Sequence, residues 1–260
     1  MLRCQQYTGR GQANTQDPLF HPSESMEIKR ASLETCGSAT DMVIVIDVLR
    51  AFTTAAHMFA AGAHEIMLVG TVEEALALRR RIPGALVMGE VDGLPVAGFD
   101  LGNSPSALLG MDLTGRRLIQ RTSAGTQGVV RSTQASALLA CSFVCAGATA
   151  RYIRQRAPAS VTFVITGVSP DLDGDEDAAC ADYLESLLGT EDALDSVPFV
   201  RRVPDSGVGR LFADPGRPSL PAVDMACAMA VDLFDFAMPV ERKNGLLTMK
   251  PVRVADRSLA

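Results

Sequence analysis

The chain has 260 residues, of which 47% are hydrophobic and 21% are charged, so it can bury a sizeable core, as one large α/β domain or as two intimately packed lobes. The formal net charge of −6 and the absence of basic runs argue against broad nucleic-acid or membrane-surface binding, because such contacts need clustered Lys and Arg. Any anionic ligand must therefore meet a locally positive pocket.

The first forty residues are rich in Gln, Thr, Gly, Pro and Ser and lack the apolar run of a secretory signal. Such a composition cannot bury enough apolar surface to order itself. We therefore expect residues 1–40 to be a poorly ordered polar tail, residues 41–260 to form the folded domain, and the protein to be cytoplasmic.

The six cysteines contain no CxxC pair, which favours reduced core thiols over a zinc site or a disulfide framework. Three histidines leave little material for a His-rich metal site or a His-dependent triad. The chemistry must rest on carboxylates, hydroxyls and backbone amides.

Short β-branched runs alternate with helical stretches after residue 41, as is typical of α/β proteins. The run 42–48 has the pattern of a strand buried on both faces, and the spacing of Thr71 and Glu74 predicts a capping box at a helix start. We expect further strands at 65–69, 85–89, 117–121, 138–143 and 161–167, and helices at 51–61, from 71 onward, at 148–156 and at 176–188.

The sequence after residue 204 departs from this alternation of strands and helices. Residues 204–221 are rich in Gly and Pro and suggest a long surface connection. Residues 234–240 and 246–252 then predict an antiparallel hairpin around Lys243-Asn244-Gly245. The predicted fold is an α/β/α sandwich around a mostly parallel, mixed sheet.

Open α/β sheets bind ligands beyond the carboxyl ends of their strands, so the residues that follow each strand are the candidates for a site. At the first junction, Asp47 precedes Arg50 and the hydroxyls of Thr53 and Thr54. A carboxylate there can hold Mg²⁺ and an Arg can fork a phosphate or sulfonate. The alternative is that Asp47 and Arg50 only pair or cap the helix.

The second junction, residues 89–105, places Glu90, Asp92 and Asp100 in a Gly-rich loop. The loop ends at Asn103 and Ser104, before a Pro, in a helix-start pattern whose free amides can face an anion. An ordinary ordered loop is the competing interpretation, because Asp and Gly are common in turns.

The third junction, residues 121–128, has the small, hydroxyl-rich composition of a phosphate cradle but not the spacing of a P-loop. The fourth, residues 166–177, has aspartates at EF-hand spacing, but Glu176 stands where the required Gly would be. Residues 175–177 fit a helix start better than a calcium loop.

These four segments resemble the ComB family of magnesium-dependent 2-phosphosulfolactate phosphatases, over about residues 43–240. The resemblance rests on a strand ending in DVLRA with TT after it, a GE loop running into GFDLGNSP, a T-x-GT loop and a late ED-x-x-C-A helix. It implies a requirement for Mg²⁺ and the hydrolysis of 2-phosphosulfolactate to sulfolactate, a step towards coenzyme M.

Carried over residue by residue, the resemblance implies metal or catalytic roles for Asp47, Glu90 and Asp100, with Arg50 in catalysis. The expected substrate contacts are Arg50, Thr53, Thr54, Asn103, Ser104, Thr122, Ser123, Gly125 and Thr126. Direct attack by water is preferred, since Leu49 stands where the DxD of haloacid-dehalogenase phosphatases has its second Asp.

The chain departs from the expected family pattern after Glu90, where Val91 and Asp92 replace an Arg and Gly-rich residues. Losing a guanidinium there weakens the case for a doubly anionic sulfonate substrate. A non-catalytic or repurposed anion-binding protein of this type therefore stays open. A nucleotide-binding oxidoreductase is disfavoured, because no GxGxxG follows a predicted strand. The expected partner is a small-molecule phosphate ester, with no nucleic acid and no membrane, and a homodimer is left open.

Overall fold

The computed structural model describes residues 26–190 and 194–254. One 11-stranded sheet runs through it in the order β1-β8-β2-β7-β11-β12-β3-β6-β4-β5, with β13 beside β11. Its strands are β1 (Glu27–Ser32), β2 (Met42–Ile46), β3 (Glu65–Leu68), β4 (Leu86–Val91), β5 (Leu94–Pro95), β6 (Arg117–Arg121), β7 (Ala137–Cys141), β8 (Ser160–Ile165), β11 (Phe236–Lys243), β12 (Leu246–Met249) and β13 (Val252–Arg253). A separate small hairpin pairs β9 (Val168–Ser169) with β10 (Leu172–Asp173).

Helices cover this sheet. They are α1 (Ala51–Ala60), α2 (Val72–Arg81), α3 (Gly125–Arg131), α4 (Ala146–Arg156), α5 (Asp175–Gly189), α6 (Val197–Val200), α7 (Gly207–Phe212) and α8 (Ala222–Ala228), with 3₁₀ turns η1 (Cys36–Ser38), η2 (Ser106–Leu108) and η3 (Phe143–Cys145). The predicted capping box of α2 is confirmed, because Thr71 and Glu74 bond to each other's backbone amides.

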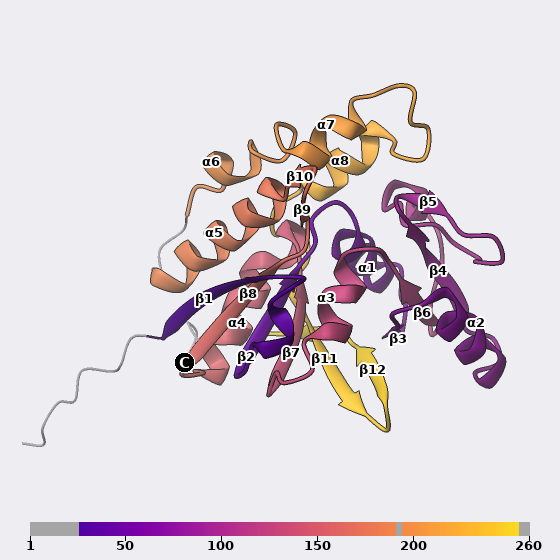
Figure 1. Cartoon of the computed structure of the whole chain (residues 1–260), viewed down its shortest axis with the longest axis horizontal. Helices are drawn as coiled ribbons and strands as arrows, with labels where there is room; N and C mark the ends of the chain where they lie inside the picture. Colours follow the sequence, from indigo (N-terminus) through magenta and orange to yellow (C-terminus); the bar gives the residue numbers. More distant parts are fainter. Residues whose placement is uncertain (1–25, 191–193, 255–260) are drawn as a thin grey trace, which may run out of the picture.

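The sheet has two parallel halves. Strands β1, β8, β2 and β7 form the first, and β3, β6 and β4 form the second. The hairpin β11–β12 joins them, antiparallel to β7 on one side and to β3 on the other. Helix α3 contacts β2, β7 and β3, so the sheet folds around it, while α4 and α5 cover the first half and α2 the second (Figure 1). The predicted α/β fold with a mixed, mostly parallel sheet is confirmed.

Strand β2 is buried along its whole length, as its β-branched run predicts. Helices α3 and α5 both pack against it, which explains why an alternation of polar and apolar residues is absent. The C-terminal hairpin is also confirmed. Asn244 and Gly245 form its two-residue turn with φ of 51° and 77°, the positive values that a type I′ turn requires.

Two expectations about connecting segments differ from the structure. Residues 27–38, expected within the polar tail, contain β1 and η1. Strand β1 pairs in parallel with β8, and Arg30 contacts Asp182 and Glu185 of α5 at 2.6 and 2.8 Å. Residues 1–25 lie outside the described residues.

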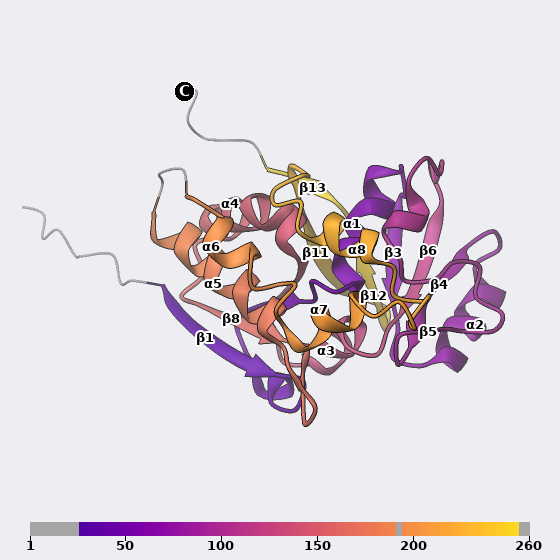
Figure 2. The same ribbon diagram turned by 90° about the horizontal axis from the view of Figure 1, so that it is seen from above.

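The predicted surface connection at 204–221 is wrong in part, because it contains α7. Ser206 caps this helix by accepting a hydrogen bond from the Gly209 amide at 2.9 Å. Helices α7 and α8 lie across the middle of the molecule seen from above (Figure 2). The segment therefore covers the strand ends and is more than a linker.

Among the described residues, no helix combines the length and the apolar content needed to cross a bilayer. The cysteines at 36, 141, 145, 180 and 227 carry free thiols, and all but the last are buried. Burial raises the pKa of the Cys141 thiol well above its ordinary value, which agrees with a protonated core residue.

Candidate active site

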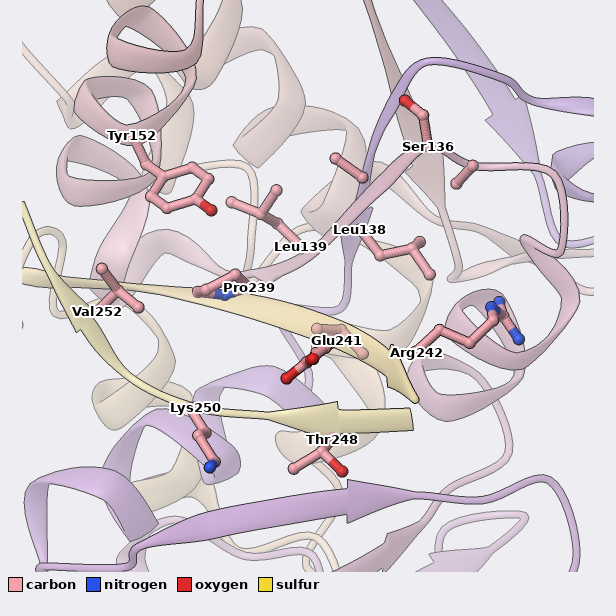
Figure 3. Close-up of a pocket in the computed structure, with 13 residues that line it drawn as sticks. Ser136, Leu138, Leu139, Tyr152, Pro239, Glu241, Arg242, Thr248, Lys250 and Val252 are labelled. Carbon is pink, nitrogen blue, oxygen red and sulfur yellow. The ribbon is translucent and has the colours of Figure 1, made fainter. Parts of the chain in front are cut away.

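Two hollows in the surface differ sharply in chemistry. A groove of about 510 Å³ lies between α4 and the β11–β12 hairpin, lined by residues such as Tyr152, Pro239 and Lys250 (Figure 3). No residue expected from the sequence to form a site lines that groove. A cavity of about 430 Å³ instead lies at the carboxyl ends of β2, β4, β6 and β8, and its lining includes the expected residues Asp47, Arg50, Glu90, Asn103 and Ser123.

Acidic side chains dominate the polar lining of this cavity. Five carboxylates face it, against two guanidinium groups, those of Arg50 and Arg217. The five are Asp47, Glu90, Asp92, Glu176 and Asp177. Such crowding of like charges is unfavourable without a cation or added protons, so the cavity differs from an ordinary protein surface.

Asp47 leaves β2 and holds the start of α1. Its Oδ1 accepts a hydrogen bond from the Ala51 amide at 2.8 Å, and its side chain is 4% exposed. The pKa of Asp47 is raised to about 7, mainly by burial and also by the nearby Glu90 and Glu176, while hydrogen bonds from the amides of Ala51 and Gly125 act in the opposite direction. A Cβ on Gly125 would lie 2.7 Å from Oδ2 of Asp47, so only glycine allows this approach.

Glu90 ties the loop after β4 to the loop after β6. Its Oε1 accepts from the Ser123 amide and its Oε2 from the Gly93 amide, both at 2.6 Å. Arg121 adds a second tie, because its Nη1 donates to the carbonyl of Glu90 at 2.8 Å and to Oγ of Ser123 at 3.2 Å. The side chains at these two strand ends are thus held in one arrangement.

Asp177 and Glu176 enter the same cavity from the start of α5. Asp177 accepts hydrogen bonds from the amides of Val48, Thr166 and Gly167 at 2.8 to 3.1 Å. Burial, Glu176 and Asp47 raise the pKa of Asp177 well above its ordinary value. The sequence interpretation assigned these two acids only to a helix start, although the ED pair of the family pattern was the available signal.

Glu176 and Asn103 carry oxygens of a different kind. Burial raises the pKa of Glu176, and nearby Asp173 and Asp175 act in the same direction. Within the described chain, Oε2 of Glu176 and Oδ1 of Asn103 are buried side-chain oxygens without a hydrogen-bond partner. Both residues line the cavity, so two acceptors are available there to a ligand.

Arg50 has a buried protein partner, so one nitrogen of its guanidinium is already engaged within the protein. Its Nη1 donates to Oδ2 of Asp224 and to the carbonyl of Ser219, at 2.8 and 2.9 Å. The two charged side chains are 4% and 0% exposed. The alternative expected from the sequence was a pairing or capping role for Asp47 and Arg50, whereas the structure pairs Arg50 with Asp224. The expected contact of Arg50 with a phosphate stays a prediction.

Asp224 also takes the place that an anion was expected to fill at the 104–106 segment. Its Oδ1 accepts from Oγ of Ser104 at 2.8 Å and from the amide and Oγ of Ser106 at 3.0 and 2.6 Å. Ser104 therefore supports the ion pair and does not line the cavity.

The other expected site residues lie outside the cavity lining. Asp100 accepts from the Val87 amide at 2.8 Å and pairs with Arg79 at 3.2 Å, away from the other carboxylates. Thr122 and Thr126 bond to each other around the start of α3, which replaces the expected open cradle. Those outside the lining are Thr53, Thr54, Asp100, Ser104, Thr122, Gly125 and Thr126.

The donor set suits a hard cation better than any other group. Carboxylate and amide oxygens are the ligands that Mg²⁺ prefers, and it needs only one or two carboxylates when waters and phosphate complete its shell. In the residues that the structure describes, no three His, Cys, Asp or Glu side chains converge as a preformed metal cage. The partnerless oxygen of Glu176 beside Asp47 and Glu90 nevertheless fits such an ion.

Comparison with known proteins identifies the family of the chain. The family model described as "2-phosphosulpholactate phosphatase" matches residues 28–200. The chain belongs to the 2-phosphosulfolactate phosphatase family. A Bacillus subtilis (strain 168) protein named "Probable 2-phosphosulfolactate phosphatase" is 32% identical over 82% of this chain and 92% of its own length.

Two further relatives carry the same printed name. The proteins from Deinococcus radiodurans and Carboxydothermus hydrogenoformans are each 39% identical, over 58% and 69% of this chain and over 64% and 69% of their own lengths. The resemblance inferred from the sequence is thus confirmed. In this member of the 2-phosphosulfolactate phosphatase family, Arg217 and four other lining residues lie beyond residue 200, so one wall of the cavity comes from outside the segment that the family model matches.

Proposed function

We propose that the protein hydrolyses a small anionic phosphate monoester with the help of Mg²⁺, and that the ester is 2-phosphosulfolactate, giving sulfolactate and phosphate. Family membership and the printed names of the relatives support the substrate. The observation that carries the metal is the gathering of five carboxylates on one cavity, with a buried, partnerless oxygen on Glu176.

In this proposal Glu176 would hold the ion together with Asp47 or Glu90, and water and phosphate oxygens would complete its shell. Bound Mg²⁺ would neutralise phosphoryl oxygens and stabilise the charge of the transition state. The protein fixes the carboxylates in advance, because backbone amides hold Asp47 and Glu90. A water oxygen forms the new bond to phosphorus, the ester P–O bond breaks, and the alcohol oxygen leaves with a proton.

The test is phosphate release from a panel of monoesters by the full-length protein, before and after chelation. EDTA should abolish the release of phosphate from 2-phosphosulfolactate, and added Mg²⁺ should restore it. Glu176→Gln should lower kcat about 100-fold, whereas Asp100→Asn, a carboxylate outside the cavity, should retain activity. Full turnover after exhaustive chelation would refute the metal requirement.

Metal binding has a readout that does not depend on turnover. Mg²⁺ should raise the melting temperature of the wild-type protein and of Asp100→Asn, since a ligand that binds only the folded state stabilises it. The shift should be much smaller for Glu176→Gln. Equal shifts in all three proteins would place the ion elsewhere.

A second candidate is a non-catalytic anion-binding protein. It is favoured by Val91 and Asp92, which depart from the family pattern expected after Glu90, at the edge of the cavity. Calorimetric binding of sulfolactate without phosphate release from any ester would support that function over hydrolysis.

A further inference from the structure

The cavity's acidic lining raises the question of which residue recognises the negative charge of the ester. Arg50 and Arg217 are the cationic side chains on the lining. Asp224, itself 0% exposed, already balances the charge of Arg50 in a buried ion pair. Arg217 is therefore the lining cation whose charge is available to a ligand.

Arg217 is placed to reach a ligand without a competing strong partner. In the part of the chain that the structure describes, its ion pair is with Asp214, at 3.4 Å between two side chains that are about half exposed. Exposed pairs of this kind contribute little to stability and exchange readily. An anion in the cavity can therefore take the guanidinium from Asp214.

The backbone on both sides of Arg217 is anchored, so the residue has a defined position. Its amide donates to the Asp214 carbonyl at 3.1 Å, and its carbonyl accepts from the Leu220 amide at 2.9 Å. The carbonyl of Ser219 is held by Arg50. A Cβ on Gly93 would lie 3.9 Å from Leu220, which shows that this loop packs against the loop carrying Glu90.

We propose that Arg217 binds the sulfonate of the ester, an anionic group that is not transferred, and so selects esters that carry it. This inference rests on the proposed function. It gives the cavity a guanidinium where Val91 offers none, and it places the selecting residue beyond the 28–200 segment that the family match covers. A planar guanidinium suits a sulfonate or carboxylate because it donates two parallel hydrogen bonds.

The test compares 2-phosphosulfolactate with 2-phospholactate, which lacks only the sulfonate. With saturating Mg²⁺, Arg217→Gln should raise KM for 2-phosphosulfolactate about 10-fold, with kcat nearly unchanged and KM for 2-phospholactate little affected. Arg217→Lys should fall between the two, since it keeps the charge and loses the fork. A uniform change for both esters would overturn the proposal.

A matched control and a binding measurement separate this inference from the proposed function. Arg210→Gln removes a more exposed arginine from α7, whose pair with Asp173 spans 4.0 Å and which does not line the cavity, so it should behave as wild type. Calorimetric titration with sulfolactate should show about 10-fold weaker binding to Arg217→Gln alone. If Arg217→Gln binds sulfolactate more weakly but the wild type releases no phosphate, the role of Arg217 is supported and hydrolysis is refuted. If all the proteins bind sulfolactate equally, or none binds it detectably, the role of Arg217 is overturned.

Discussion

Replacing Asp47 by Asn should stabilise the metal-free protein at pH 8 and not at pH 5. The pKa of Asp47 is about 7, against an ordinary value of 3.8, because the carboxyl is buried near Glu90 and Glu176. At about 1.4 kcal/mol per pH unit, the ionised group costs the fold on the order of 4 kcal/mol. Because the pKa of Asp47 is raised in the folded state, protonated Asp47 contributes its full stabilisation of the fold below pH 3.8. That contribution is lost as the pH rises through about 7.

The substitution has a cost of its own. Amides of Ala51 and Gly125 both donate to Asp47, and an Asn side chain has one carbonyl oxygen, so one hydrogen bond is lost at about 1 to 2 kcal/mol. The net gain at pH 8 is then about 2 kcal/mol, or about 5 °C in melting temperature. At pH 5 the wild-type carboxyl is protonated in the folded state but ionised in the unfolded state, which costs the fold about 1.5 kcal/mol. This roughly cancels the lost hydrogen bond, so the two proteins should melt at nearly the same temperature.

The assay is thermal unfolding followed by circular dichroism, on EDTA-treated wild type, Asp47→Asn and Asp100→Asn at pH 5 and pH 8. The Asp100 variant is the control, because its carboxyl accepts from the Val87 amide and pairs with Arg79 outside the cavity. It should show no gain at pH 8. A shift for Asp47→Asn of the same sign and size at both pH values would refute the argument from buried charge.

Three other predictions, made with four variants, test the fold. Asp224→Asn should lower the free energy of unfolding by about 3 to 5 kcal/mol, because it leaves a buried guanidinium unpaired; a urea titration showing less than about 1 kcal/mol would contradict this. Gly89→Ala should lower the free energy of unfolding by about 3 kcal/mol or more, since φ is 131° and the new Cβ would lie 1.8 Å from the Arg121 carbonyl. The control Gly98→Ala, at φ 86° in open space, should lower it by about 1 kcal/mol in the same titration. Deleting residues 1–39 removes β1 from the sheet and should lower the melting temperature; an unchanged value would show that β1 adds no stability.

Local patterns were enough to predict the strand ends that carry Asp47, Glu90 and Ser123. Buried β-branched runs mark parallel strands, and parallel strands bring their carboxyl ends to one edge. Glu176 was predicted only at a helix start, which the structure confirms. Its place on the cavity lining was missed because an acid at a helix start already has a local explanation in the helix dipole. Its approach to the cavity depends on how α5 packs against β2 and β8.

Long-range partners limited the rest of the prediction. Asp224 lies 174 residues from Arg50 in a segment without a recognisable motif, so the ion pair could not be anticipated from spacing. Helix α3 was not predicted, because the hydroxyl- and Gly-rich residues 121–128 were interpreted as a loop with the composition of a phosphate cradle. Packing against β2, β7 and β3 supplies the stability that the local sequence lacks.

The order of strands also sets the order in which the molecule can be assembled on the ribosome. Every strand of the two parallel halves is made by residue 165, yet the hairpin between them is formed by residues 236–249. The nascent chain therefore holds β7 and β3 with unpaired edges until nearly all of it has emerged. Such long-range closure slows folding, and exposed strand edges favour aggregation. Truncation before residue 236 should therefore yield an aggregation-prone product. A chaperone would be needed until the hairpin has been made.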